Sequence, residues 1–215
     1  MKIAVAQHKG GVGKTTLATH VAGLLSEDDL KKLLLIDCDS QGDSFRFYTG
    51  RLPEEEQEID TDMNDVDVLW NLERASLSTS GAYAEYDNIV VDIDTRIQNA
   101  LQVITELSPD IILIPVDDQY LSLSHLKDAL SLIHSIEGVV SYPAVVKIVQ
   151  MGADHDLESI LAPMTDLPSS LYIGYGLPYL RKAFNESLSK CKLIWNLNEE
   201  YYSINKLIDE VISYE

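Results

Sequence analysis

A glycine-rich loop between a short apolar run and an amphipathic run most restricts what this chain can fold into. The loop is Lys9-Gly10-Gly11-Val12-Gly13-Lys14-Thr15-Thr16, and it follows a strand expected over residues 3–6. Glycines let successive backbone N–H groups converge on phosphate oxygens without Cβ clashes. The N-terminus of the helix expected over residues 15–26 adds partial positive charge. This strand–loop–helix context predicts a phosphate-binding P-loop, and a merely tight turn is the weaker alternative.

The side chains of the loop suggest distinct roles. Lys14 can reach the β- and γ-phosphates of a nucleotide, and Thr15 can offer its hydroxyl to Mg²⁺. His8 occupies the first glycine position of the ordinary P-loop pattern, and a second lysine, Lys9, lies five residues before Lys14. The cofactor-binding segment of the loop comprises Lys9, Gly10, Gly11, Val12, Gly13, Lys14, Thr15 and Thr16.

The rest of the chain alternates short apolar runs with longer amphipathic ones, which is typical of parallel strands joined by crossover helices. Strands are expected over residues 33–36, 88–91, 110–116, 144–149 and 170–173. Helices are expected over residues 97–107, 119–136, 154–162, 178–189 and 199–213. The pattern predicts an α/β fold, a mostly parallel twisted sheet flanked by helices, in a single domain over residues 1–215.

Charge and cysteine content exclude several classes of protein. The chain has 16 Lys and Arg against 35 Asp and Glu, a net charge of −19, which counts against a surface that grips nucleic acid or anionic lipid throughout. Two cysteines, Cys38 and Cys191, exclude a disulfide-rich scaffold and a four-cysteine zinc site. No segment reads as a signal peptide or approaches the ~20 apolar residues of a membrane span. We therefore expect a cytoplasmic protein.

Two further apolar runs end in carboxylates. Asp37 and Asp39 follow the run 33–36, and their spacing lets them project to the same side. Asp92 ends the run 88–91 in a Walker B-like pattern and would hold Mg²⁺ through water. The alternative for the first pair is loop capping. Asp94 either adds a carboxylate near the metal or caps the next helix, and we favour capping.

Together, these motifs resemble the deviant Walker A ATPases of the ParA/MinD superfamily along nearly the whole chain. The resemblance implies that Lys9 reaches across a nucleotide-sandwich dimer to the partner's ATP, that Asp39 helps place the attacking water and that Asp37 supports the Mg²⁺ shell. Ser40 and Asp94 depart from it, because the family usually has proline near both positions. The implied catalytic residues are Lys9, Lys14 and Asp39, and the implied metal-site residues are Thr15, Asp37 and Asp92.

Two later segments are similar to the family more loosely. Asp117 and Asp118 follow the strand 110–116 at the edge where ligands bind in such sheets, and we favour helix capping for both. Residues 172–182 resemble the segment that contacts adenine, largely through its backbone. This similarity places the base near residues 176–179, and the contacts that it implies are Pro178 and Tyr179.

Two charged segments stand out from the rest. Arg181, Lys182, Lys190 and Lys192 form a small basic excess within an acidic chain. On ParA-type proteins, basic residues in this region bind DNA without reading its sequence, and a solvated helix face is an equal alternative. Any DNA binding should be weak and strongly salt-dependent. Residues 51–67 are rich in Asp and Glu, and we favour a solvated loop over a partner-contact or specificity insertion.

The resemblance implies a ParA-type ATPase that positions or segregates a cargo, such as a plasmid, a chromosome region or a protein organelle. ATP and Mg²⁺ would close a homodimer on the nucleoid, and a ParB-like or adaptor protein would stimulate hydrolysis. Three alternatives remain: a MinD-like spatial regulator, a dethiobiotin-synthetase-like biosynthetic enzyme and a non-hydrolysing ATP-dependent scaffold. The acidic polar face of residues 198–215 disfavours a membrane partner and favours a docking helix.

Overall fold

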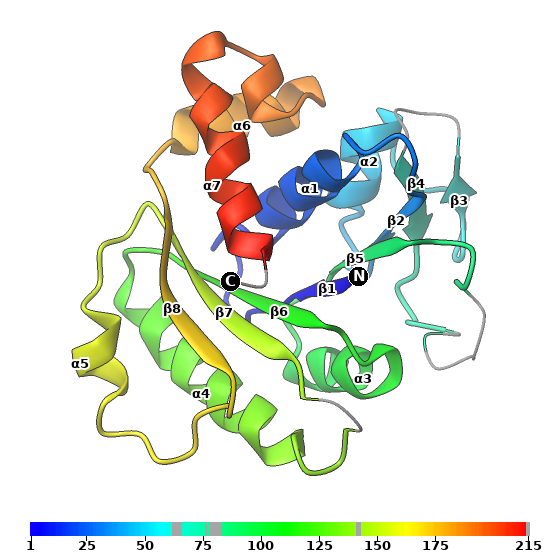
Figure 1. The fold of residues 1–215 in the computed structure, drawn as a ribbon. Coiled ribbons are helices and arrows are strands. Elements are labelled where there is room, and N and C mark those ends of the chain that lie inside the picture. Colours follow the sequence, from blue (N-terminus) through cyan, green and yellow to red (C-terminus); the bar gives the residue numbers. More distant parts are fainter. Residues whose placement is uncertain (62–65, 76, 78–82, 141–142, 214–215) are drawn as a thin grey trace.

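The fold is built on a twisted sheet that runs through the middle of the molecule (Figure 1). The computed structural model describes residues 1–61, 66–75, 77, 83–140 and 143–213, and within them the sheet has eight strands in the order β3-β4-β2-β5-β1-β6-β7-β8. The strands are β1 (Lys2–Val5), β2 (Leu33–Asp37), β3 (Ile59–Asp60), β4 (Val66–Trp70), β5 (Asn88–Asp92), β6 (Ile111–Val116), β7 (Val145–Met151) and β8 (Leu171–Leu177). Neighbouring strands pair in parallel except β3, which is antiparallel to β4. The predicted α/β class is confirmed.

Helices cover both faces of this sheet (Figure 1). One face carries α1 (Lys14–Leu25), α2 (Asp43–Thr49), α6 (Arg181–Lys190) and α7 (Tyr202–Ile212), and the other carries α3 (Ile97–Leu107), α4 (Tyr120–Ile136) and α5 (Leu157–Leu161). Because successive side chains of a strand point to opposite faces, β1 gives Ile3 and Val5 to one core and Ala4 to the other. The continuous apolar runs of the sequence are strands buried on both faces, as expected.

The helix at the C-terminal end packs against the sheet. Helix α7 buries Ile204, Ile208 and Val211 in the core beside α1, so the predicted docking helix is confirmed. Lys147 of β7, which is 1% exposed, donates a hydrogen bond from Nζ to the main-chain oxygen of Ser213, just beyond α7. No helix in the described parts of the chain combines the length and hydrophobicity that a membrane span requires.

Two elements near the site were not predicted from the sequence. Helix α2 is short, and it lies between Gly42 and Gly50, which both have positive φ, at 62° and 72°. Strand β4 extends out of the acidic stretch, and the short β3 pairs with it at the edge of the sheet. The solvated-loop interpretation is therefore wrong for residues 59–60 and 66–67, because backbone pairing to the sheet fixes them.

The acidic stretch also packs on the segment that precedes α2. A Cβ atom at Gly42 would lie 2.8 Å from Cδ of Pro53, so the approach of the two segments depends on glycine there. Arg51 forms ion pairs with Glu58, at 2.6 Å, and with Asp60, at 3.2 Å, which fold the stretch back on itself. The described part of the stretch is therefore attached to the segment that carries Asp39.

Candidate functional site

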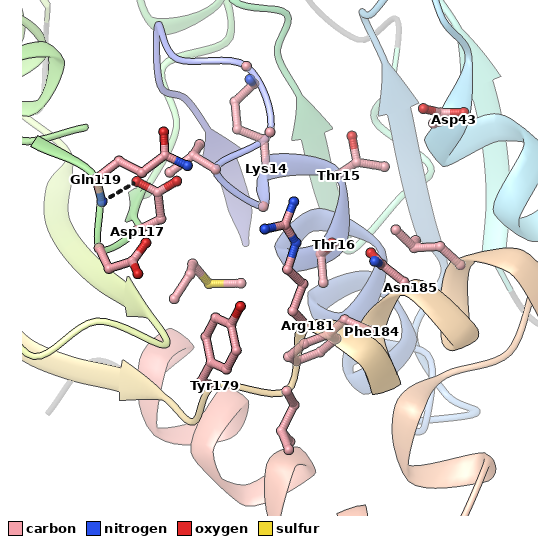
Figure 2. A pocket seen from close by; sticks show the side chains of 18 of the residues that line it. Lys14, Thr15, Thr16, Asp43, Asp117, Gln119, Tyr179, Arg181, Phe184 and Asn185 are labelled. Carbon is pink, nitrogen blue, oxygen red and sulfur yellow. Dashed lines mark hydrogen bonds between the residues drawn. The ribbon is translucent and has the colours of Figure 1, made fainter. Parts of the chain in front are cut away.

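A cavity of about 760 Å³ lies at the carboxyl-terminal edge of the sheet, where ligands bind in parallel α/β folds. Figure 2 shows that it opens between the glycine-rich loop, the segment after β6 and the start of α6. The predicted site residues that line it are Gly10, Gly11, Val12, Gly13, Lys14, Thr15, Thr16, Asp39, Pro178, Tyr179 and Arg181. The fold thus brings most of the predicted nucleotide-binding residues to one cavity.

The glycine-rich loop ends directly at the N-terminus of α1. Gly13 is the N-cap residue with φ 102°, a left-handed conformation that side chains disfavour. Lys14 is 7% exposed, and its Nζ donates to the main-chain oxygen of Lys9 across 3.3 Å. Burial lowers the pKa of the Lys14 ammonium, although nearby carboxylates oppose that shift. A buried cation beside a helix N-terminus is suited to an anionic ligand such as a phosphate.

Asp37 and Asp92 are paired in register at the ends of β2 and β5. Asp37 is 0% exposed, and its carboxylate accepts from the backbone N–H of Asp39 and of Phe45, each at 2.9 Å. Burial and the neighbouring Asp92 raise the pKa of Asp37 above its ordinary value. Asp37 therefore holds the loop after β2 and the start of α2, which is a structural contribution to the site.

Only one of the two carboxylate oxygens of Asp92 accepts a hydrogen bond within the described residues. Its Oδ2 accepts a hydrogen bond from Ser44 Oγ at 2.6 Å, whereas its Oδ1 has no partner among the described residues and the side chain is 1% exposed. Burial raises the pKa of Asp92, and the hydroxyls of Ser44 and Thr15 and the Lys14 ammonium oppose the rise. An unpartnered carboxylate oxygen at a polar cavity is suited to a cation or to its water.

The donor set fits Mg²⁺, which the P-loop motif implies. Hard oxygen donors are present in the Thr15 hydroxyl and in Oδ1 of Asp92. No group of three or more His, Cys, Asp or Glu within the described ranges has the arrangement of an all-protein metal site. Magnesium does not need one, because it takes most of its ligands from water and from substrate phosphates.

Asp39 borders the cavity on a loop whose backbone is fixed at several points. Its N–H donates to Asp37, its Oδ1 accepts from Gln41 N–H at 3.0 Å, and its main-chain oxygen accepts from Trp70 Nε1 at 3.0 Å. Trp70 thus positions the Asp39 backbone, and no motif in the sequence signals that contact.

Lys9 and Asp117 form an ion pair beside the cavity, with side chains 11% and 13% exposed. The helix-capping interpretation is wrong for Asp117, because α4 begins later, with Gln119 as its N-cap residue and without a capping side-chain hydrogen bond. Asp118 is exposed and lines the cavity. Asp94 accepts from Arg96 N–H, at 3.0 Å, but Arg96 is the N-cap residue of α3, which also has no capping side-chain hydrogen bond, so the capping interpretation is wrong for Asp94 as well.

The segment after β8 closes the other side of the cavity. Tyr179 is 65% exposed, and Figure 2 shows its ring and the Arg181 side chain extending into the cavity. The lining residues that sequence reasoning missed are Gln41, Asp43, Thr95, Gln119, Met151, Leu180, Phe184, Asn185 and Leu188. Most lie on turns or on the first turns of helices next to recognised motifs, so only their position in the fold reveals them.

The predicted basic cluster divides in the structure. Arg181 lines the cavity, whereas Lys190 is exposed and pairs with Glu186 at 2.7 Å along α6. Lys182 and Lys192 are exposed. The four cations therefore do not share one environment.

Comparison with known proteins identifies the family to which the chain belongs. Residues 3–162 match the family described as the CobQ/CobB/MinD/ParA nucleotide binding domain. The fold is similar to apo McdA from Cyanothece (TM-score 0.76, 18% identity, 98% of this chain and 97% of that chain). It is also similar to an ATP complex of McdA from Cyanothece (0.75, 18%, 98% and 94%) and to the septum site-determining protein MinD with Mg-ADP from Pyrococcus horikoshii (0.72, 15%, 99% and 96%). At these identities the solved structures establish the fold alone.

Proposed function

Because this chain belongs to the CobQ/CobB/MinD/ParA nucleotide-binding family, we propose that it is a ParA-type ATPase that closes an ATP-bound homodimer. The observation that carries the proposal is the pair of lysines, Lys9 and Lys14, in one phosphate-binding loop beside one cavity. The ATP and Mg-ADP complexes of proteins with this fold support ATP as the ligand. Both lysines lie within residues 3–162, the part of the chain that matches the family.

Each part of the cavity has a task in this proposal. The loop N–H groups and Lys14 hold the phosphates, and Pro178 and Tyr179 border the base. Thr15 and Asp92 would hold Mg²⁺, which would neutralise negative charge on the nucleotide phosphates. Asp39 orients the attacking water, and Asp37 keeps Asp39 in place through its backbone N–H. Catalysis is then mostly positioning and charge neutralisation.

Lys9 supplies the step that requires a second copy. In the closed dimer its ammonium neutralises the γ-phosphate bound by the partner, so hydrolysis and dimerisation depend on each other. A ParB-like or adaptor protein stimulates the turnover of ATP. The cycle of ATP binding and hydrolysis, which takes place in the cytoplasm, positions or segregates a cargo. This scheme assigns Lys9, Lys14 and Asp39 to catalysis and Thr15 and Asp92 to the metal site, which Asp37 supports by holding the loop after β2 and the start of α2.

Steady-state hydrolysis of ATP tests the enzyme assignment. The wild-type chain should release phosphate slowly and only with Mg²⁺, Lys14→Ala should lose nucleotide binding, and Asp39→Ala should bind ATP without turnover. If the wild-type chain dimerises with ATP but releases no phosphate with any activator, it is the non-hydrolysing scaffold. If Asp39→Ala turns over normally, Asp39 has no catalytic role.

Non-specific DNA binding by the dimer forms a separate part of the proposal. Of the four cations predicted for it, Lys182 and Lys192 are exposed, whereas Lys190 is paired with Glu186 and Arg181 lies at the cavity. Retention on DNA at low salt should fall for Lys182→Glu with hydrolysis intact, whereas Lys206→Glu on α7 is the charge-matched control. Equal retention of the two variants would exclude this surface.

A further inference from the structure

The ammonium of Lys9 is bound to a carboxylate of its own chain. Its Nζ pairs with Oδ2 of Asp117 at the end of β6, and both side chains are nearly nine-tenths buried. Water therefore screens this pair less than it screens an exposed one, so the attraction is stronger than in a surface ion pair. Lys9 in this state is turned toward its own sheet.

Three hydrogen bonds besides the ion pair with Lys9 hold Asp117 in place. Its backbone N–H donates to Ser122 Oγ at 3.2 Å, and its main-chain oxygen accepts from His155 Nε2 at 2.8 Å. Its Oδ1 accepts from the N–H of Gln119 at 3.2 Å. Ser122 is fully buried, so α4 itself anchors this arrangement. The remaining oxygen, Oδ2, is thus a pre-organised acceptor for the lysine.

The other end of Lys9 is linked to the phosphate-binding lysine. The main-chain oxygen of Lys9 accepts the hydrogen bond from Lys14 Nζ, across 3.3 Å. A phosphate that draws Lys14 toward itself competes for that hydrogen bond. Occupation of the cavity therefore acts directly on the backbone of the residue whose side chain Asp117 holds.

We propose that Asp117 is a positioning residue that retains Lys9 within its own chain until a second ATP-loaded copy offers a phosphate in its place. This inference rests on the proposed function, because it concerns the same lysine in the same dimer. The ammonium cannot stay buried against Asp117 and also reach another chain, so each closing dimer breaks two such ion pairs. Asp117 therefore sets the protein concentration at which the dimer forms.

The test compares the wild-type chain with Asp117→Asn, which keeps the shape of the side chain and removes its charge. Dimerisation is measured by sedimentation equilibrium with Mg²⁺ and ATPγS. The protein concentration at which half of the chains are dimeric should fall about tenfold in Asp117→Asn, because a charge-assisted contact within the monomer no longer opposes dimerisation. Asp118→Asn is the matched control, since Asp118 lines the same cavity but has no described contact with Lys9. It should change the concentration less than about twofold, which separates the ion pair from a general loss of negative charge.

A second readout follows Lys9 in the nucleotide-free monomer. The rate at which an amine-reactive reagent acylates Lys9, measured by mass spectrometry, should rise several-fold in Asp117→Asn and remain unchanged in Asp118→Asn. Asp117→Glu keeps a carboxylate and should restore part of the protection. If Asp117→Asn dimerises like the wild-type chain or more weakly, or if Lys9 acylation is unchanged, the inference is wrong while the proposed function stands. A wild-type chain that stays monomeric with ATPγS contradicts the proposed function itself.

Discussion

The indole N–H of Trp70 donates a hydrogen bond to the main-chain oxygen of Asp39 across 3.0 Å. Trp70 ends β4, next to β2 in the sheet, whereas Asp39 lies on the loop that borders the cavity. The edge of the sheet therefore fixes the backbone of the residue that we assign to the attacking water.

Replacement of Trp70 by Phe should lower kcat about three- to tenfold and leave KM nearly unchanged, because Asp39 loses a backbone tether rather than a contact with bound nucleotide. Trp195→Phe is the matched control, since Trp195 is 7% exposed and lies in the core away from the cavity lining. Steady-state hydrolysis of ATP checks both variants. An equal loss of kcat in the two would point to general destabilisation.

Two glycines that flank α2 allow the packing of the acidic stretch to be measured. Gly50 has positive φ, and no atom lies within 4 Å of the Cβ that alanine would add. Gly50→Ala should therefore lower the free energy of unfolding only by the backbone strain, about 1 kcal/mol. Gly42→Ala introduces the same strain, and its Cβ would also clash with Pro53. It should therefore lower the free energy of unfolding by about 2–4 kcal/mol. Urea unfolding measures both free energies. Equal values would mean that residues 51–60 do not pack on this loop in solution.

The unpartnered oxygen of Asp92 predicts a magnesium effect. Asp92→Asn should raise the Mg²⁺ concentration needed for tight ATP binding about tenfold or more, because the site loses a charged acceptor. Asp94→Asn is the control, since both carboxylate oxygens of Asp94 accept hydrogen bonds at the start of α3, from Arg96 and Asn99. Titration of Mg²⁺ against a fluorescent ATP analogue distinguishes the two. A shift as large for Asp94→Asn as for Asp92→Asn would place the cation elsewhere.

His20 predicts a loss of stability in acid. It is fully buried between α1 and the turn at residue 194, with Nδ1 donating to the Thr16 carbonyl at 2.7 Å and Nε2 accepting from Ile194 N–H at 3.1 Å. Burial lowers the pKa of His20 to about 4. Since the folded pKa lies below the unfolded value, the stabilisation is complete above the unfolded pKa and falls as pH drops toward 4.

Between about pH 7.5 and about pH 5, the His20 contribution to the free energy of unfolding should fall by about 2 kcal/mol. His20→Gln should therefore show a flatter pH dependence than the wild-type chain. If His20→Gln keeps the wild-type slope, His20 is not the titrating group.

Hydrophobic patterning alone was sufficient to predict the order of most strands and helices. Apolar runs such as residues 33–36 and 111–116 are long enough and pure enough to be strands buried on both faces. Strand β4 was missed because Asp67 interrupts its apolar run and the strand adjoins an acidic run. Helix α2 was missed because it has only seven residues, and its stability comes from Phe45 in the core and from its flanking glycines.

The phosphate-binding side of the cavity could likewise be predicted from the sequence. Its residues are contiguous, and the chemistry of phosphate binding explains each glycine and lysine in the loop. The contacts of Lys9 with Asp117 and of Trp70 with Asp39 were not, since each joins residues far apart in the chain. They depend on which strands are neighbours and on where α4 begins. No local pattern encodes either of these features.

We assign one lysine of the loop, Lys14, to the nucleotide of its own chain and the other, Lys9, to the partner's nucleotide across a dimer. Light scattering of Lys9→Ala and of the wild-type chain, each with Mg²⁺ and ATPγS, tests this most directly. The wild-type chain should show twice the molar mass of one chain, whereas Lys9→Ala should remain a monomer while binding the nucleotide with nearly wild-type affinity. A Lys9→Ala protein that dimerises as readily as the wild-type chain would contradict the claim.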